Sequence, residues 1–379
     1  MKVAHVLPAL TKGGGEKVAA ELANHASRAG HQVVLIAGWP VDPGLLRETL
    51  LPDIRVFYVS KQSKSRTGRY LKLIVWFWRH TDLLSKQDVI HCHLSYGVVF
   101  GFLVKLWQSV TRIEGPAIVQ TNHSAGAPVS DLRRVVQSFF ARQCNALALI
   151  AEDEYWSLFA KKHPRIITRV IFNGISQPNH SIVDPLDRDA YRREVGIPDN
   201  CKLVVGAIGR LTADREPWTY LPIFEEIARD FGEDVHFLLA GGGSELEAMR
   251  ALAIEKGLAG QVHFPGEVND PTLPLAVMDL YISINVGAIT GLAGMEAALS
   301  GLPVIAMQWT PGYYAAPEDW IWSSTNQSEV AQRSCELLKS PSSRDALAQR
   351  QKSFVQSNHT IDTMASSYYD MYNSAIARL

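Results

Sequence analysis

Short apolar runs alternate with helical patterns along this chain, and the alternation limits the folds that it can adopt. The run VAHVL at 3–7 is followed by GEKVAAELANHASRAG, whose apolar residues recur with helical spacing, and then by QVVLIAG at 32–38. Runs that are apolar throughout are typical of strands buried on both faces of a sheet. The pattern predicts an α/β fold with a mostly parallel sheet.

The alternation occurs in two series. The first continues with apolar runs at 54–60, 89–94, 117–123, 146–152 and 170–174, and the second has runs at 203–209, 235–241, 262–266, 280–285 and 303–307. Residues 175–200 are polar and contain prolines, as a linker does. We therefore expect two doubly wound Rossmann-like domains, 1–178 and 179–359, that face a cleft, with ligands at the carboxyl ends of the strands.

Composition argues against several classes of protein. The chain has 37 basic and 38 acidic residues, so its overall charge gives no reason to expect a nucleic-acid partner. Its four cysteines are far apart and form no paired or metal-type spacing, which is typical of reduced thiols. The start of the chain turns polar at Thr11, too early for a signal peptide, and no run approaches the ~18 apolar residues of a membrane span. We expect a cytoplasmic protein.

Three glycines, Gly13, Gly14 and Gly15, separate the first expected strand from the first expected helix. Free amides at a helix start attract an anion, and glycines let a phosphate or a sugar approach the backbone. A flexible turn is the alternative interpretation.

Arg210 and Arg215 lie in GRLTADREP, directly after the first strand of the second series. Two guanidinium groups at a strand end can hold a diphosphate through charge-assisted hydrogen bonds worth roughly 1.5–3 kcal/mol each. Surface arginines near a helix start are the alternative. A nearby stretch, GGGSEL at 241–246, resembles part of a dinucleotide fingerprint, with Glu267 where a ribose-binding acid would stand, but Leu246 replaces the third glycine.

A helix expected to start near Thr290 carries the carboxylate of Glu296. Its first amides, those of Gly291, Leu292 and Ala293, suit a phosphate, and Glu296 follows about one turn, ~5.4 Å, further along. Because a carboxylate accepts hydrogen bonds from two neighbouring hydroxyls, Glu296 would suit a ribose. A glutamate that only stabilises the helix dipole is the alternative.

The motifs GGGEKVAAELA, DVIHCH, VQTNH, VIFNG, GRL, VHFPG and GMEAALSGLPVIA stand in this order across nearly the whole chain. In this combination the chain resembles the GT-B fold glycosyltransferases, specifically the large retaining family-four group. The resemblance implies an acceptor-side domain at 1–178 and a nucleotide-sugar donor domain at 179–359. It also implies a terminal helix, about 360–379, that packs back on the first domain.

The resemblance implies transfer of a sugar from a UDP-sugar or a GDP-sugar to an acceptor hydroxyl with retained configuration. Arginines would hold the diphosphate, Glu296 the ribose and the backbone near Gly266 the base, while His123 would lie beside the donor sugar as a contact or proton relay. A satisfied core histidine is the alternative for His123. The predicted catalytic residues are His123, Arg210 and Arg215, and the predicted donor-binding residues are Gly14, Gly15, Arg210, Arg215, Gly266, Glu267, Val268, Gly291, Leu292, Ala293 and Glu296.

The chain departs from the family pattern near Glu296. Relatives usually have a second glutamate eight positions earlier, where this chain has Ala288. Ile289 and Thr290 replace the usual glycine and phenylalanine, and the usual Lys-Gly after GRL is Arg215-Glu216. Arginine keeps the positive charge but changes the hydrogen-bond geometry. These changes leave the donor sugar open.

No metal or cofactor is expected, because two arginines and helix amides can stabilise a leaving diphosphate. The DRD run at 187–189 lies in the expected linker. His91 and His93 flank Cys92 at a strand end, but the sequence offers no further ligand beside them, so zinc is not expected.

The segment 61–80 mixes basic and aromatic side chains: Lys61, Lys64, Arg66, Arg69, Lys72, Trp76, Phe77, Trp78 and Arg79. Such a segment suits an anionic membrane surface carrying a lipid-linked acceptor, at the inner face of the plasma membrane. A solvated basic loop before a partly buried helix is the alternative. Three functions therefore remain: a glycosyltransferase of surface polysaccharide, lipopolysaccharide or glycolipid biosynthesis; a nucleotide-sugar epimerase on the same fold; or, because of Ala288, a nucleotide-sugar-binding protein without catalysis.

Overall fold

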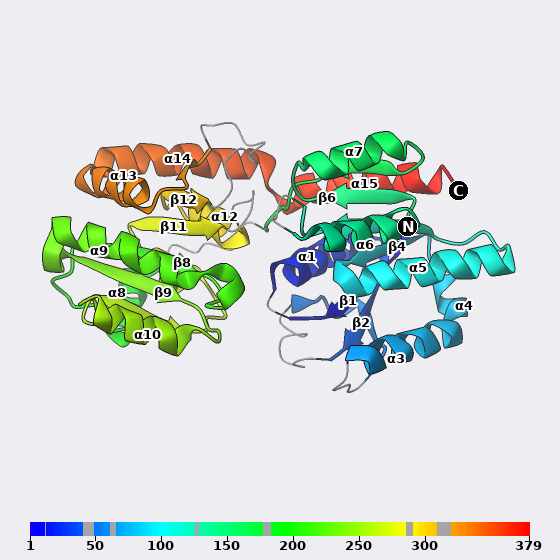
Figure 1. Ribbon diagram of the computed structural model, residues 1–379, viewed down its shortest axis with the longest axis horizontal. Coiled ribbons are helices and arrows are strands. Elements are labelled where there is room, and N and C mark those ends of the chain that lie inside the picture. Colours follow the sequence, from blue (N-terminus) through cyan, green and yellow to red (C-terminus); the bar gives the residue numbers. More distant parts are fainter. Residues whose placement is uncertain are drawn as a thin grey trace. The chain divides into compact units, whose positions relative to one another are not determined.

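The computed structural model describes residues 1–379 except 12, 41–48, 61–65, 126–128, 177–182, 286–290 and 309–319. The chain divides into two compact units (Figure 1). The first comprises Met1–Ser176 and His359–Leu379, and the second comprises Gln177–Asn358. Each unit is built on one parallel sheet with helices packed on it, which confirms the predicted fold class.

The sheet of the first unit has, in the described residues, seven strands in the order β3-β2-β1-β4-β5-β6-β7. The order reverses between β1 and β4, as in a doubly wound fold. Its strands are β1 (Lys2–Ala9), β2 (Gln32–Trp39), β3 (Arg55–Tyr58), β4 (Val89–His93), β5 (Ala117–Asn122), β6 (Ala146–Leu149) and β7 (Ile167–Val170). Its helices are α1 (Gly14–Arg28), α3 (Arg66–Arg79), α4 (Thr81–Leu84), α5 (Leu94–Thr111), α6 (Asp131–Ala141), α7 (Glu154–Lys162) and α15 (Ile361–Ile376).

The sheet of the second unit has, within the described ranges, six strands in the order β10-β9-β8-β11-β12-β13. Its strands are β8 (Leu203–Ile208), β9 (Val235–Ala240), β10 (Val262–Gly266), β11 (Leu280–Asn285), β12 (Val304–Gln308) and β13 (Trp322–Ser324). Its α-helices are α8 (Pro185–Glu194), α9 (Tyr220–Phe231), α10 (Leu246–Glu255), α11 (Thr272–Ala276), α12 (Leu292–Leu299), α13 (Gln327–Lys339) and α14 (Pro341–Asn358). Short 3-10 helices cover Ala213–Arg215, Pro217–Thr219 and Gly232–Asp234.

The apolar runs form the centres of both sheets. Every residue of β4, β5 and β9 is buried, which explains why these strands lack polar alternation. Helix α1 buries one face, including Val18 and Leu22 one turn apart, and leaves Lys17 exposed. Among the described residues, no helix is long and apolar enough to cross a membrane.

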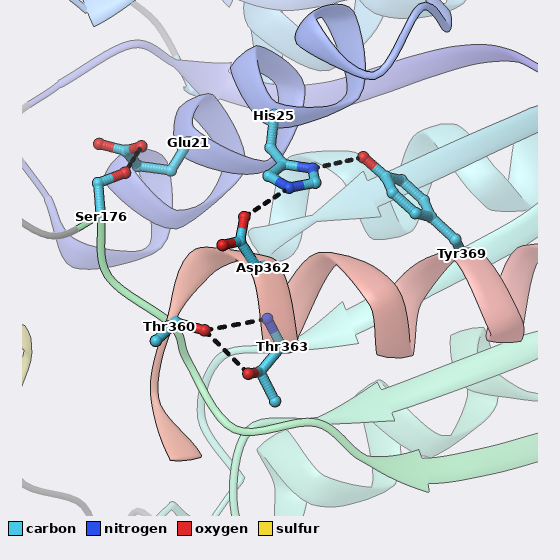
Figure 2. A network of polar contacts seen from close by, with 7 residues as sticks. All are labelled: Glu21, His25, Ser176, Thr360, Asp362, Thr363 and Tyr369. Carbon is cyan, nitrogen blue, oxygen red and sulfur yellow. Dashed lines mark hydrogen bonds and ion pairs between the residues drawn. The ribbon is translucent and has the colours of Figure 1, made fainter. Parts of the chain in front are cut away.

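The last helix of the chain, α15, belongs to the first unit and contacts α1 and strands β5, β6 and β7. Figure 2 shows polar contacts that join it to α1. His25 of α1 contacts the Tyr369 hydroxyl through Nδ1 at 2.8 Å and the Asp362 carboxylate through Nε2 at 3.0 Å. Thr360 caps α15 by accepting a hydrogen bond from the Thr363 amide at 3.1 Å. The helix is thereby fixed across the sheet.

The expected strand at 170–174 is wrong in its extent, because β7 ends at Val170. Beyond it, the amide of Gly174 donates to Met364 Sδ at 3.1 Å, and the Asn173 carbonyl contacts His359 Nδ1 at 3.1 Å. A Cβ on Gly174 would collide with the Thr360 carbonyl oxygen, so only glycine permits this approach. The segment leaves the sheet to pack against the start of α15.

Candidate active site

The carboxyl ends of the second unit's strands meet at one edge of its sheet, because all of them run parallel. The strand order reverses between β8 and β11, and doubly wound folds bind ligands at such a point. Every donor-binding residue predicted in this unit lies at or after the carboxyl end of β8, β10 or β11: Arg210, Arg215, Gly266, Glu267, Val268, Gly291, Leu292, Ala293 and Glu296.

Arg210 and Arg215 share one carboxylate in the loop after β8. Asp214 Oδ2 lies 3.5 Å from Arg210 Nη2 and 3.8 Å from Arg215 Nε. The arginine side chains are 56% and 55% exposed, so water screens these ion pairs and they contribute little to stability. Partial burial and the neighbouring Arg210 lower the pKa of Arg215. Two cations that hold a single exposed carboxylate can exchange it for a diphosphate.

The glycines at 241–243 pack against the loop after β8. A Cβ on Gly241 would collide with the carbonyl oxygen of Gly209, and a Cβ on Gly243 with that of Leu211. The Leu211 amide also donates to the Gly242 carbonyl at 2.8 Å. Close approach of two backbones therefore explains the glycines of GGGSEL without a dinucleotide.

The predicted base-binding segment, 266–268, lies beside the same loop. Gly266 ends β10 with φ +85°, a conformation that favours glycine. A Cβ on Gly242 would lie 3.3 Å from Glu267 Cβ, so the two loops are in contact. Val268 is partly exposed. The loops that follow β8, β9 and β10 thus contact one another.

Helix α12 begins slightly later than expected, with Gly291 as its N-cap and Leu292 as its first residue. Thr290 and Ala288 lie outside the described residues. Leu292 and Ala293 are the first two residues of α12, so their amides have no acceptor within the helix. Glu296 is partly buried and follows Leu292 by four residues, about one turn. The predicted one-turn spacing between the first amides of this helix and the Glu296 carboxylate is therefore retained.

Two tyrosines join the end of β8 and the start of α9 to β11. The Tyr281 hydroxyl accepts from the Ile208 amide at 3.1 Å and donates to the Ile208 carbonyl at 3.0 Å, while the Tyr220 hydroxyl accepts from the Ile284 amide at 3.4 Å. Burial raises the pKa of Tyr220 to about 12 despite the nearby Arg215. Burial also raises the pKa of Tyr281, with smaller contributions from Tyr220 and Glu296. The tyrosines therefore stay neutral and fix the backbone beside the candidate ligand site.

In the first unit, Gly14 and Gly15 are the first two residues of α1, and Gly13 is its N-cap. Their amides lack a partner within the helix. A Cβ on Gly13 would collide with the Glu16 carboxylate, which folds back towards the helix start. The helix dipole favours a carboxylate in this position. The predicted anion site therefore has an internal competitor that the sequence analysis did not identify.

His123 follows β5 and lies against Gly15. A Cβ on Gly15 would lie 3.4 Å from both Cγ and Nδ1 of His123 and 3.1 Å from Leu94 Cδ2. Burial lowers the pKa of His123 to about 4, so its ring is neutral at physiological pH. The structure thus brings together two predicted site residues that are more than a hundred positions apart in the chain.

Behind His123 lies a group of histidines that sequence reasoning found only in part. His5, His91 and His93 are fully buried, and one ring nitrogen of each lies within 4.8 Å of the others, a spacing that can hold a metal ion. The sequence showed only His91 and His93 at this place. The third imidazole is that of His5, which lies beside His91 because β1 and β4 are paired. However, His91 contacts the Tyr372 and Thr121 hydroxyls, each at 2.7 Å. These contacts account for both of its nitrogens without a metal.

Comparison with known proteins identifies the family. The profile described as Glycosyltransferase Family 4 matches residues 12–177, and that described as Glycosyl transferases group 1 matches residues 202–340. A D-inositol 3-phosphate glycosyltransferase of Corynebacterium glutamicum is 26% identical over 293 residues, which cover 73% of this chain and 65% of that protein. The chain thus spans somewhat less than two thirds of the length of this relative.

Solved structures resemble the whole chain. Sucrose-phosphate synthase from Thermosynechococcus elongatus has a TM-score of 0.77 at 18% identity and covers 100% of both chains. Alr3699/HepE from Anabaena, in complex with UDP and glucose, has a TM-score of 0.76 at 17% identity and covers 99% of this chain and 100% of that one. The fold and these matches define a GT-B fold glycosyltransferase. Within that class, the chain belongs to the glycosyl transferases of group 1.

Proposed function

We propose that the protein transfers a glycosyl group from a nucleotide sugar to a hydroxyl of a glycan or lipid-linked acceptor. The observation that carries this proposal is the edge of the second sheet, where Arg210, Arg215 and the start of α12 with Glu296 flank the point of strand reversal. Cations and amides suit a diphosphate, and a carboxylate one turn further suits a ribose. A UDP-sugar is the favoured donor, because Alr3699/HepE binds UDP-glucose, with a GDP-sugar as the alternative.

In the proposed reaction the bond between the sugar C1 and the diphosphate oxygen breaks, and the acceptor oxygen bonds to C1. The acceptor proton leaves with the departing diphosphate. Arg210, Arg215 and the α12 amides would stabilise the negative charge that develops on the diphosphate, so no metal ion is needed for that purpose. His123 would contact the donor sugar. We propose retention of configuration, in line with the family-four resemblance.

The first unit offers support for a lipid-linked acceptor at a membrane surface. Helix α3 leaves Leu71, Ile74, Val75 and Trp78 exposed by 65%, 40%, 44% and 46%, at the spacing of one helix face. The charged residues of α3 are all basic: Arg66, Arg69, Lys72 and Arg79. An exposed apolar stripe beside basic residues suits an anionic bilayer.

Helix α6 carries a second stripe that the sequence analysis did not identify. Leu132, Val135, Val136 and Phe139 are 75%, 61%, 47% and 51% exposed, again at helical spacing. Helix α5 lies between and contacts both α3 and α6 (Figure 1). We call the outer surface of these three helices the apolar-basic face. We propose that this face docks on an anionic membrane that holds the acceptor, as an enzyme of surface polysaccharide or glycolipid biosynthesis requires.

A single assay separates this function from its alternatives. The protein is incubated with a panel of labelled UDP- and GDP-sugars, with and without vesicles that carry membrane lipid extract. Release of nucleoside diphosphate with a glycosylated lipid or glycan supports transfer, and the anomeric configuration of the product reports retention or inversion. An isomerised intact donor would support an epimerase instead, and donor binding without turnover would support a binding protein, as Ala288 suggests.

A further inference from the structure

Three imidazoles form a line of hydrogen bonds that ends at His123. His5 Nδ1 lies 3.1 Å from His93 Nε2, and His93 Nδ1 lies 3.1 Å from His123 Nε2. The residues come from β1, β4 and the end of β5, which are adjacent strands. His5 and His93 are fully buried, whereas His123 is partly exposed. The line therefore leads from the core of the first unit's sheet to His123, which follows the carboxyl end of β5.

All three rings are neutral at physiological pH. Burial lowers the pKa of His5 to about 3 and that of His123 to about 4, and it holds the pKa of His93 well below its ordinary value. A neutral imidazole carries one N–H and one bare nitrogen. Each hydrogen bond joins the N–H of one ring to the bare nitrogen of the next, so both bonds must be donated in the same direction along the line. Either all three rings carry the proton on Nδ1 or all three carry it on Nε2.

The far end of the line distinguishes these two arrangements. His5 Nε2 is buried, and no described residue provides it with a hydrogen-bond partner. If the protons lay on Nε2, this atom would be a buried N–H without an acceptor. If they lie on Nδ1, it is a bare nitrogen without a donor. Unpaired buried N–H groups are rarer in proteins than under-satisfied acceptors, so the Nδ1 arrangement is favoured.

We propose that His5 and His93 are positioning residues that fix His123 as its Nδ1–H tautomer, so that His123 donates a hydrogen bond to its ligand. The ligand atom would then be an oxygen acceptor, either a sugar hydroxyl or a phosphate oxygen. The surroundings agree, since Nδ1 of His123 lies beside Gly15 at the start of α1, where helix amides are also donors. The tautomer follows from the histidine line alone, whereas its use on a donor substrate rests on the proposed function.

Nitrogen NMR of the full chain labelled with ¹⁵N-histidine tests the tautomer without any substrate. Long-range ¹H–¹⁵N spectra at pH 7.5 show which ring nitrogen carries the proton, and single variants assign the signals. We expect Nδ1–H for His5, His93 and His123. An Nε2–H signal for His123 in the wild-type protein overturns the proposal, whatever the variants do.

Matched variants test the coupling along the line. The amide nitrogen of asparagine occupies the position of Nδ1, whereas that of glutamine reaches the position of Nε2. His93→Asn therefore retains a donor towards His123, and His93→Gln does not. We expect His123 to keep its Nδ1–H signal in His93→Asn and to show mixed tautomers in His93→Gln. In the same way, His5→Asn keeps the donor towards His93, and His5→Gln loses it.

The kinetic readout follows from the same pairs. With the best donor from the panel, kcat/KM should fall about tenfold further in His93→Gln than in His93→Asn, the effect of one misdirected hydrogen bond. Equal losses in both variants with equal NMR spectra would mean that His93 only fills space, and the proposal would be wrong. If the spectra behave as expected but no nucleotide sugar binds, the proposed function fails while the tautomer assignment stands.

Discussion

The backbone of Gly15 lies directly against the imidazole of His123, so that a Cβ on Gly15 would be 3.4 Å from Nδ1 of the ring. The same Cβ would lie 3.1 Å from Leu94 Cδ2, tighter than an ordinary contact. Leu94, at the start of α5, and His123 therefore leave little room for a side chain on Gly15. This closeness makes the position of His123 sensitive to a single methyl group.

Gly15→Ala should lower activity without lowering stability. The added methyl requires Leu94 and His123 to move by a few tenths of an ångström, and misplacement of a substrate contact reduces kcat/KM. Alanine is a better helix former than glycine by up to about 1 kcal/mol, which offsets the cost of these movements, so Tm should change little. Thermal unfolding and donor kinetics check the two effects separately. Unchanged kinetics would show that His123 does not contact substrate.

Arg210→Ala and Arg215→Ala should each weaken UDP binding by roughly 10- to 100-fold, because each removes a charge-assisted hydrogen bond of about 1.5–3 kcal/mol. Asp214→Asn should strengthen binding instead, since the Asp214 carboxylate now lies beside both guanidinium groups. Calorimetric titration with UDP measures all three. Arg229→Ala is the matched control, because Arg229 is an exposed arginine of the same unit that pairs with Glu225 on α9. A similar loss of UDP affinity in Arg229→Ala would mean that the effect reflects the overall surface charge and not a site at Arg210 and Arg215.

Glu296→Ala should abolish preference for the ribose hydroxyls. The wild-type protein should bind UDP at least tenfold more tightly than 2′,3′-dideoxy-UDP, because hydrogen bonds to a carboxylate are worth about 1.5–3 kcal/mol. The variant should bind the two ligands equally. Its affinity for pyrophosphate should remain that of the wild type, which serves as the internal control. If Glu296→Ala still prefers UDP over 2′,3′-dideoxy-UDP, Glu296 does not bind the ribose and only stabilises the helix dipole.

The fold class was predictable because the signal for it is local. Continuous apolar runs mark strands buried on both faces, and β4, β5 and β9 show this burial along their full length. Residues 171–174 misled the prediction because Ile171 and Phe172 extend the apolar run of the strand. Asn173 and Gly174 contact residues near 360, and nothing local in the sequence reveals such a distant partner.

Positions in the candidate site were predictable only where the residue type and its spacing along the chain are enough to indicate a ligand. Glu296 lies one turn after helix amides whatever its surroundings, so its position could be foreseen. The glycines at 241–243 could not be interpreted, because ligand binding and close packing of two loops require the same residue. The histidine line depends on strand order, which places His5 beside His93 although 88 positions separate them.

Acidification should destabilise the protein between pH 6.5 and about 4. Burial lowers the pKa of His5 to about 3 and those of His123 and His263 to about 4, whereas the unfolded chain has the ordinary value of 6.5. In this window the unfolded state binds protons that the folded state does not. The free energy of unfolding therefore falls as pH falls, by up to about 1.4 kcal/mol per pH unit for each such histidine.

Urea denaturation at pH 7.5, 6.5 and 5.5 measures this slope. His5→Asn removes one of the buried histidines and should reduce the slope by up to one proton. A free energy of unfolding that is constant or higher at pH 5.5 would contradict the burial of neutral histidines in this fold.

Removing apolar side chains from the apolar-basic face should weaken binding to anionic vesicles. Leu132→Ser with Phe139→Ser, and separately Leu71→Ser with Trp78→Ser, should each reduce partitioning to phosphatidylglycerol vesicles by roughly tenfold or more. Burying one such side chain in a bilayer is worth about 1.5–3 kcal/mol. Vesicle co-sedimentation measures the effect, and raised salt should weaken wild-type binding because the basic residues contribute.

Leu186→Ser provides the matched control for this face. Leu186 and Leu132 are both 75% exposed, but Leu186 lies on α8 in the second unit. If docking depends on α3, α5 and α6, the control variant should sediment with vesicles as the wild type does. Equal losses in Leu186→Ser and the α6 variant would show that exposed leucines bind lipid without regard to position. Strong binding to neutral phosphatidylcholine vesicles would likewise contradict a role for the arginines and the lysine of α3, because that surface carries no net charge to attract them.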